Sequence, residues 1–176
     1  MSCVWVISDC HFGHKGIERF RPNVTCVAEN DYVIHDNILT HCTKRDTLWF
    51  LGDCFLRTES LNLLRDFRKS IGFIHMVLGN HDTERDRYKT IIQPAIDKRL
   101  FDSVHGLKKV KGKAWMSHAP MHPLELWGKI NIHGHVHLNT IPDQRYVNVC
   151  VDNTDMKPVK LQDIYAGWRG KDNHAY

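Results

Sequence analysis

Five short polar clusters, each just after an apolar run, offer the side-chain types that bind metal ions. They are Asp9-Cys10-His11, Gly52-Asp53, Gly79-Asn80-His81-Asp82, Ser117-His118 and Gly134-His135-Val136-His137. Together they supply carboxylate, amide and imidazole groups. Two neighbouring divalent cations need several such ligands, with one group shared between the ions. The sequence therefore predicts a centre for two metal ions that carries out a hydrolysis.

Taken singly, most of these clusters have an ordinary structural explanation. Asp9 after a strand could cap a helix or make an Asx turn, and Gly52-Asp53 and Gly79-Asn80 are common turn dipeptides. His135 and His137 differ, because in extended backbone side chains at i and i+2 share a face, so their imidazoles could reach neighbouring metals. It is the combination of all five clusters that favours a metal centre.

The elements that must position these clusters are visible in the apolar pattern. Two segments have helical periodicity, about Glu29 to Cys42 and Ser60 to Lys69, where Ser60 could cap. Alternation of strands and helices predicts parallel βαβ units, whose strand ends gather distant loops at one edge of a sheet. The second half is expected to be richer in strands, with a hairpin near Gly112. The expected strands are Val4 to Ser8, Thr47 to Leu51, Ile74 to Leu78, Ala114 to Ser117, Ile130 to His133 and Arg145 to Val149.

Length and composition indicate one ordinary domain. The 176 residues predict a single domain over residues 1–166 and a polar tail over residues 167–176. No apolar stretch approaches the about 20 residues of a membrane span, and no signal peptide is recognised after Met1. We therefore expect a cytoplasmic protein, a monomer or homodimer, without membrane contact.

The net charge of +4 is mild, and one basic run stands out. Lys108, Lys109, Lys111 and Lys113 alternate with other residues, as in a hairpin that faces solvent. Aromatic residues, which single-strand binders use to stack bases, do not interleave with them. Nucleic acid as a partner stays open.

The five clusters, in this order and strand-end context, resemble the calcineurin-like metallophosphoesterases, specifically a small, cap-less type found in bacteria and phages. The resemblance covers residues 4 to about 152. It implies an α/β fold, a four-layer α/β/β/α sandwich of two mixed sheets, with a dinuclear metal site at the strand ends. It also implies two divalent ions per chain, with Mn²⁺ preferred and Fe, Zn²⁺, Ni²⁺ or Co²⁺ as alternatives.

The resemblance also assigns roles to individual residues. It implies that Asp53 bridges the ions, that His81 is the catalytic histidine and that Asp82 orients it. His14 and Arg57 are candidate substrate contacts, as is Asn80, which is also a ligand. One ion would be held by Asp9, His11 and His137, and the other by Asn80, His118 and His135.

Two departures from larger relatives bear on the substrate. Cys54-Phe55-Leu56-Arg57 follows Gly52-Asp53, where protein phosphatases of this superfamily resemble Gly-Asp-x-Val-Asp-Arg-Gly. Cys150 stands in Asn148-Val149-Cys150-Val151-Asp152 where the family has glycine. The missing Asp-Arg-Gly unit and the small size favour an open site for a small phosphodiester, of nucleotide or cyclic nucleotide type, over a phosphoprotein.

Three alternatives remain at this point. The first is a phosphomonoesterase that acts on a small substrate, and the second is a nuclease. The third is a noncatalytic interaction scaffold, which would be expected to have lost the catalytic histidine. His81 and all matched ligands are present, so an enzyme is the favoured hypothesis.

Overall fold

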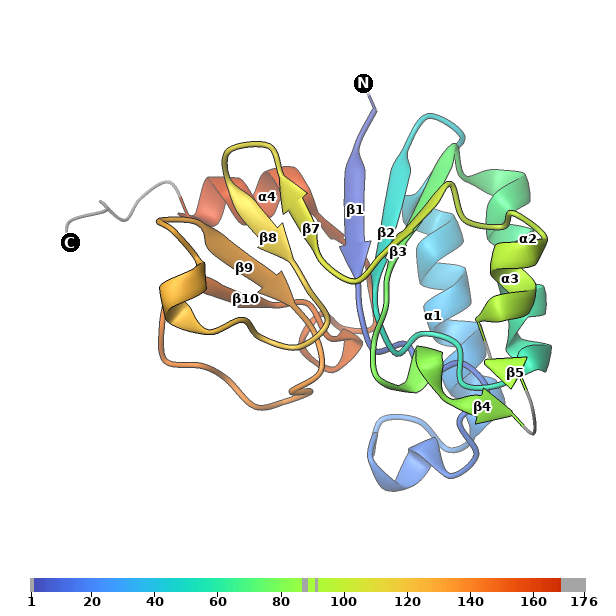
Figure 1. Cartoon of the computed structure of the whole chain (residues 1–176). Helices are drawn as coiled ribbons and strands as arrows, with labels where there is room; N and C mark the ends of the chain where they lie inside the picture. Colours follow the sequence, from blue (N-terminus) through green and yellow to red (C-terminus); the bar gives the residue numbers. More distant parts are fainter. Residues whose placement is uncertain (1, 87–88, 91, 169–176) are drawn as a thin grey trace.

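A computed structural model describes residues 2–86, 89–90 and 92–168. In this part of the chain the strands form two main sheets, with the order β11-β1-β2-β3-β6 in one and β10-β9-β8-β7 in the other (Figure 1). The first contains β1 (Val4–Ile7), β2 (Thr47–Leu51), β3 (Phe73–Val77), β6 (Ser103–His105) and β11 (Val159–Lys160). The second contains β7 (Lys108–Val110), β8 (Ala114–Met116), β9 (Ile130–His133) and β10 (Tyr146–Asn148). A short pair, β4 (Arg85–Asp86) and β5 (Lys89–Thr90), stands apart.

Parallel βαβ units build the first sheet, as expected. Strands β1, β2, β3 and β6 are mutually parallel, and only β11 runs antiparallel to its neighbour. The helices α1 (Val27–His41), α2 (Leu61–Ser70) and α3 (Gln93–Asp97) lie on one face of this sheet (Figure 1). Alternation along β2 explains why the sheet has two covered faces: Leu48 and Phe50 join the core under the helices, whereas Trp49 and Leu51 join the core between the sheets.

The second core joins the two sheets and includes the last helix, α4 (Leu161–Trp168). Its Leu161, Ile164 and Tyr165 follow helical spacing and pack with residues of both sheets, such as Val6 and Ile132. In the described part of the chain, α4 packs against β1 and β11.

The loop that contains Met121 crosses the outer side of the second sheet. The Met121 N–H donates to Asn131 Oδ1 at 2.8 Å, and the Tyr146 hydroxyl donates to the Met121 carbonyl at 2.6 Å. Helix α4 continues through Gly167 to Trp168, the first two residues of the expected tail. Residues 169–176 of that tail lie outside the described residues.

The basic run forms the expected hairpin of β7 and β8, with its turn at Gly112. Three of its lysines place their ammonium groups over rings of the same chain: Lys108 over Trp49, Lys109 over Trp115 and Lys113 over Tyr165, at 5.0–5.4 Å from the ring centroids. These cation–π contacts occupy side chains that a nucleic acid would need. No helix in the described part of the chain is both long and apolar enough to cross a membrane.

Candidate metal centre

The polar clusters meet where the carboxyl ends of strands from both sheets converge. Asp9, Asp53 and Asn80 follow β1, β2 and β3, while His118 follows β8 and His135 follows β9. Parallel strands carry these loops to one edge, because each strand begins at the same end of the sheet. Backbone hydrogen bonds join neighbouring loops there, such as Asp9 N–H to the Gly52 carbonyl at 3.0 Å.

Two groups of potential ligands occupy this edge. In each group, one ligand atom from every member lies within 4.8 Å of the others. The groups are Asp9, His11 and His137, and Asp53, His118 and His135. The sequence resemblance also places Asp9, His11 and His137 together and His118 with His135, but it adds Asn80 to the second group and assigns Asp53 to both ions.

The second group surrounds one ring nitrogen, Nε2 of His118. Asn80 Oδ1, His135 Nδ1 and Asp53 Oδ2 each lie 3.1 Å from it. Asn80 Oδ1 and Asp53 Oδ2 can only accept, and a single N–H donates poorly to two acceptors at once. A cation with ligands at about 2.1 Å in octahedral arrangement would place adjacent ligand atoms about 3 Å apart. The spacing therefore fits a cation shared by these four side chains better than hydrogen bonds among them.

The first group leaves two buried polar atoms unused. Asp9 Oδ1 and His11 Nε2 have no hydrogen-bond partner among the described residues, although both residues are buried, and the two atoms lie 3.9 Å apart. His137 Nε2 lies 4.0 Å from the same Asp9 oxygen. Unpaired buried polar atoms are rare because they lose hydration without replacement. A metal ion between these atoms would supply the missing partner.

The other oxygen of Asp9 is fully occupied. Oδ2 accepts hydrogen bonds from the Ser8 hydroxyl at 2.6 Å, the His135 backbone N–H at 2.9 Å and the Cys150 thiol at 3.1 Å. These three donors fix the carboxylate so that only Oδ1 faces the ligand group. Asp9 is therefore arranged to bind a metal through one oxygen.

Partners on the far side of the rings orient two of the histidines. His118 Nδ1 lies 2.9 Å from the Leu51 carbonyl, and His137 Nδ1 lies 3.0 Å from Asp152 Oδ2. A hydrogen on Nδ1 in each case leaves Nε2 free to bind a metal, which is the usual arrangement of metal-binding histidines. Asp152 is held in turn by the buried guanidinium of Arg21, whose Nε donates at 2.8 Å.

Electrostatics favour the metal-binding protonation states of His11 and Asp53. Burial lowers the pKa of His11 to about 3, with the positive charge of Arg21 acting in the same direction, so the ring is neutral. Burial alone would raise the pKa of Asp53, but its hydrogen bond and charge interaction with His118 and the N–H of His81 outweigh burial and lower it. A neutral imidazole and a charged carboxylate are the metal-binding forms.

Five of the potential ligands have left-handed backbone. The residues Asp9, His11, Asp53, His135 and His137 have φ between 49° and 71°. This conformation is unfavourable for residues with a side chain, by roughly 1–3 kcal/mol each, and it gathers at functional sites. It also corrects the expectation of extended backbone at His135 and His137. The two side chains reach different ligand groups because this segment is a tight turn, not a strand.

Glycines allow the loops to approach each other this closely. A Cβ on Gly134 would collide with Ser8 Oγ and Asp9 Oδ2 and would lie 2.7 Å from Ser8 Cβ. A Cβ on Gly79 would collide with Asp53 Oδ1 and would lie 2.6 Å from the Asp53 backbone nitrogen. Both neighbours are part of the centre, so the glycines in the clusters are required by packing.

The sequence resemblance implies that Asp82 orients His81, but the structure shows a different contact to this ring. The ring Nδ1 of His81 lies 2.7 Å from Glu84 Oε1, so Glu84 rather than Asp82 orients the ring. The buried Asp82 carboxylate instead accepts the backbone N–H groups of Asp53 and Gly79, both at 2.8 Å. Burial raises the pKa of Asp82 to about 6, although these hydrogen bonds oppose the shift. Asp82 thus holds the loop that carries Asp53, while His81 stands half-exposed beside it.

The two other candidate substrate contacts, His14 and Arg57, lie in different surroundings. His14 Nδ1 lies 3.3 Å from His11 Nδ1, and its ring stacks on Phe20 with the centroids 5.8 Å apart. His14 is therefore placed to orient His11. Arg57 lines a neighbouring cavity together with Gly13.

Sequence reasoning missed the residues that support the ligands. Arg21 lies in an irregular segment with no motif, yet it is buried and bonds the carbonyls of Asp9 and Cys10 at 2.5 and 3.1 Å. Asp152 ends the motif that begins at Asn148, but the sequence resemblance assigns it no role. Glu84 follows His81 at i+3, and only this spacing could have suggested their contact.

No family model matches the chain. Among curated proteins it is 25% identical over 174 residues to the uncharacterized protein MJ1445 of Methanocaldococcus jannaschii, covering 93% of this chain and 90% of that protein. It is 27% identical over 184 residues to the Gene 66 protein of Mycobacterium phage L5, covering 86% and 87% of the two chains.

The fold is shared with a solved structure. The protein of unknown function AQ665 from Aquifex aeolicus superposes with a TM-score of 0.73 and 27% identity, over 94% of this chain and 99% of that one. A phosphopantetheinyl hydrolase from Mycobacterium tuberculosis matches 59% of this chain and 35% of its own, with 19% identity and a TM-score of 0.33, too low to indicate a common fold.

Proposed function

We propose that this protein is a dinuclear metallophosphoesterase of the calcineurin-like type, and that it hydrolyses small phosphodiesters. The observation that carries the proposal is the pair of ligand groups, one with two unpaired buried atoms and the other with three side chains at 3.1 Å from His118 Nε2. Both groups contain a carboxylate and two imidazoles. This donor set suits Mn²⁺, Fe, Zn²⁺, Ni²⁺ or Co²⁺ better than Ca²⁺.

Each residue of the centre would have a definite task. Two divalent ions held there would polarise the phosphoryl group and lower the pKa of water at the site. Asp53 is suited to be shared between them, because its Oδ2 lies 3.1 Å from His118 Nε2 and its negative charge also acts on His11 in the other group. Asn80 adds a neutral oxygen, which limits the negative charge around the substrate.

His81 is suited to donate a proton to the leaving oxygen. Glu84 holds its Nδ1, and its Nε2 lies 3.9 Å from Asp53 Oδ2, at the open side of the centre. A group that transfers a proton must be within reach of the substrate but need not bind the metal. The ring is 36% exposed, so a bound substrate could contact it.

Diesters are favoured as substrates because the sequence lacks the Asp-Arg-Gly unit. A monoester dianion carries more charge and gains from a bidentate guanidinium. Arg57 is the nearest counterpart in the sequence, and it lines a cavity beside the centre and belongs to neither ligand group. A diester monoanion needs only the two cations and His81.

A substrate panel tests the proposal. Protein stripped with EDTA and reloaded with Mn²⁺ is assayed on bis-p-nitrophenyl phosphate, p-nitrophenyl phosphate, 2′,3′- and 3′,5′-cyclic nucleotides and single-stranded DNA. We expect Mn²⁺-dependent hydrolysis, with the diester preferred. A preference of tenfold or more for the monoester in kcat/KM, about 1.4 kcal/mol, would make this a phosphatase. Failure to bind two metals would contradict the centre itself.

A further inference from the structure

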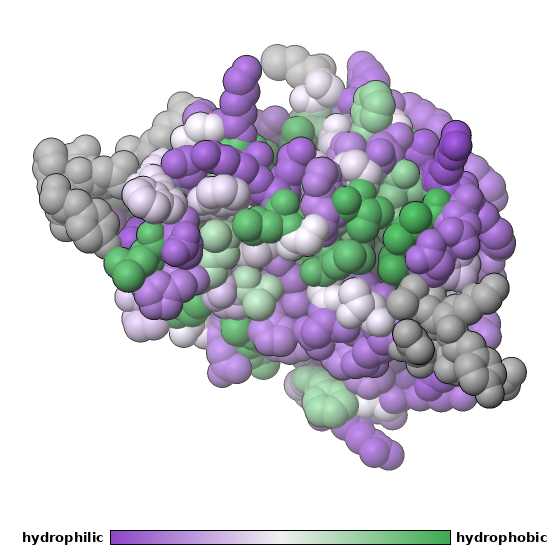
Figure 2. Space-filling model, in the orientation of Figure 1, coloured by the Kyte–Doolittle hydropathy of each residue, from purple (hydrophilic) through white to green (hydrophobic). Residues whose placement is uncertain are grey.

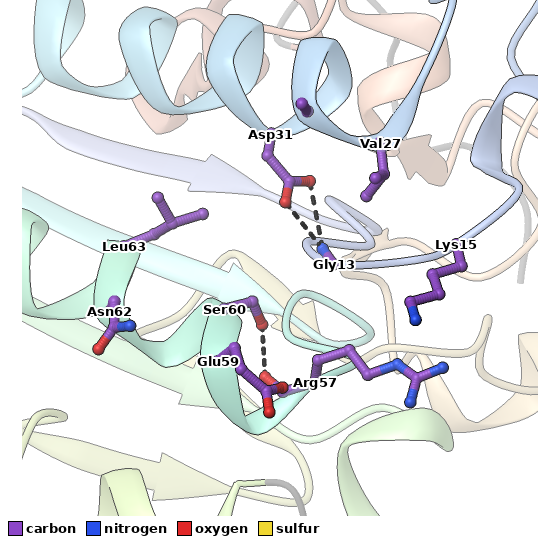
Figure 3. Close-up of a pocket in the computed structure, with 10 residues that line it drawn as sticks. Gly13, Lys15, Val27, Asp31, Arg57, Glu59, Ser60, Asn62 and Leu63 are labelled. Carbon is purple, nitrogen blue, oxygen red and sulfur yellow. Dashed lines mark hydrogen bonds between the residues drawn. The ribbon is translucent and has the colours of Figure 1, made fainter.

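A cavity of about 580 Å³ lies beside the metal centre and is not explained by metal binding. One wall is the loop after β1, including Gly13 and Lys15, and another is the first turns of α1. The third wall runs from Arg57 into the start of α2 (Figure 3). Its volume falls in the range of small-molecule sites.

The lining divides into an apolar part and a cationic part. Val27, Ala28 and Leu63 supply apolar surface. Lys15 and Arg57 extend toward each other at one side of the cavity (Figure 3). Among the residues that the structure describes, neither cationic group has an acidic partner or a hydrogen bond. Two free cations beside apolar surface suit an organic molecule that carries an anionic group.

The acidic residues of the lining, Asp31 and Glu59, form no ion pair with Lys15 or Arg57 in the part of the chain that the structure describes. Both oxygens of Asp31 accept the Gly13 N–H, at 3.0 and 3.2 Å, and Figure 3 shows this bond on the far side of the loop from the Lys15 ammonium. Glu59 is exposed and has no ion pair with Lys15 or Arg57 among the described residues. The first turns of α1 and α2 also border the cavity, and their dipoles add positive potential.

Two paired backbone segments lead from the metal centre to the lining of the cavity. His11 N–H donates to the Asp53 carbonyl at 3.1 Å, and the following residues stay paired up to Leu56 N–H and the Phe12 carbonyl at 3.0 Å. Gly13 is two residues beyond His11, and Arg57 is four beyond Asp53. These separations span at most about 7 and 14 Å, which is the length of a nucleotide-sized group.

We propose that this cavity binds the alcohol portion of the phosphoester substrate, with its organic body on Val27, Ala28 and Leu63 and a second phosphate group on Lys15 and Arg57. The substrate class is then a phosphodiester whose leaving alcohol carries another phosphate, such as a 5′-phosphorylated dinucleotide. That the occupant is a substrate rests on the proposed function; that the cavity binds a phosphorylated organic molecule does not.

Binding to metal-free protein tests the cavity without activity. Calorimetric titration of EDTA-treated protein with adenosine 5′-monophosphate is compared with titration by adenosine. We expect measurable binding of the monophosphate, at least tenfold weaker binding of adenosine, and at least a tenfold loss for the double variant Lys15→Met, Arg57→Met. Both side chains are exposed, so the variant should fold, and Lys111→Met on the hairpin turn is the matched control. Unchanged monophosphate affinity in the double variant, or no binding by the wild type, would overturn the assignment.

Hydrolysis then tests whether the occupant is a substrate. For Mn²⁺-loaded wild type, kcat/KM for the diadenylate with a 5′-phosphate should exceed that for the diadenylate without it by at least tenfold. The double variant should bring this ratio close to one, while Lys111→Met keeps it. A wild-type ratio near one would show that the cavity does not select the substrate. If neither diadenylate nor bis-p-nitrophenyl phosphate is cleaved, the proposed function fails, and the titrations still decide whether the cavity binds the phosphate.

Discussion

Asp53 is the residue on which the two halves of the centre depend. Its side chain lies against His118 in one ligand group, and its charge acts on His11 in the other. Its own backbone is held in left-handed conformation by hydrogen bonds from its N–H to Asp82 and from the His11 N–H to its carbonyl.

Asp53→Ala should therefore lose metal and nearly all activity. Asp53→Asn keeps one neutral oxygen, so it should retain part of the metal but be badly impaired. Elemental analysis of the purified proteins is the measurement, with Asp36→Ala, an exposed position on α1, as control. Two metals per chain in the Ala variant would refute the shared-ligand assignment.

His81 gives a prediction that separates proton transfer from metal binding. Because Glu84 and the backbone hold it, and because no ligand group includes it, His81→Ala should keep both metals. Turnover of substrates with alkoxide-like leaving groups should fall by about 10²–10⁴-fold. Activated p-nitrophenyl esters should lose less, since their leaving group hardly needs a proton.

Glu84→Gln supplies the matching variant for this role. It should keep the hydrogen bond that positions His81 Nδ1, so both metals and most of the turnover on alkoxide-like esters should remain. Equal losses on activated and unactivated esters in His81→Ala would instead assign the ring to phosphate binding or metal support.

Among the elements, the strand-end loops are more constrained than the strands. The strands supply direction, but the loops bring ligand residues together with left-handed backbone and side chains in direct contact. Such strain persists only where surrounding structure imposes it. The glycines in the loops are therefore as important to the centre as the ligands.

Gly134→Ala tests this constraint. The new methyl would collide with Ser8 and with the occupied oxygen of Asp9, so we expect weaker metal retention and a loss of about 1–3 kcal/mol in stability. Gly106→Ala is the control, because no atom lies within 4 Å of a Cβ there. Urea unfolding and metal analysis of both variants make the comparison; equal behaviour would mean that the loop can relax.

Much of this arrangement was predictable because β1, β2, β3, β8 and β9 are apolar runs that end at polar clusters. Strand β6 was not, since Ser103–His105 contains one apolar residue and is half-buried. Helix α4 was missed because its apolar face fits a place between two sheets that only the fold defines. Likewise, Arg21 reaches Asp152 across 131 residues of sequence, and nothing local indicates that contact.

At the scale of the whole molecule, metal binding and folding must be linked. The unpaired Asp9 Oδ1 and His11 Nε2 cost stability in the absence of a cation. Binding that occurs in the folded state alone stabilises it by mass action. The metal-free protein is thus the state in which the response of the buried His11 to acid should be measurable.

His11 gives that response a definite sign. Its pKa is about 6.5 when unfolded and about 3 when folded, so between these values the unfolded chain binds a proton that the folded chain does not. Stability is retained above pH 6.5 and falls as the pH drops through this window, by up to about 1.4 kcal/mol per pH unit. Histidines whose pKa is raised, such as His118, change the stability in the opposite direction. Both the wild type and the His11→Gln variant contain them.

His11→Gln should remove this contribution from metal-free protein. Its absolute stability will fall as well, so the informative quantity is the change in unfolding free energy between pH 7.0 and pH 5.0, measured with urea in EDTA. We expect the wild type to lose up to about 2 kcal/mol more than the variant over this interval. His122→Gln, which removes an exposed ring, should behave like the wild type. The same pH dependence in His11→Gln and wild type would mean that His11 takes up its proton in the folded state, and the buried, neutral ligand inferred for the first group would have to be abandoned.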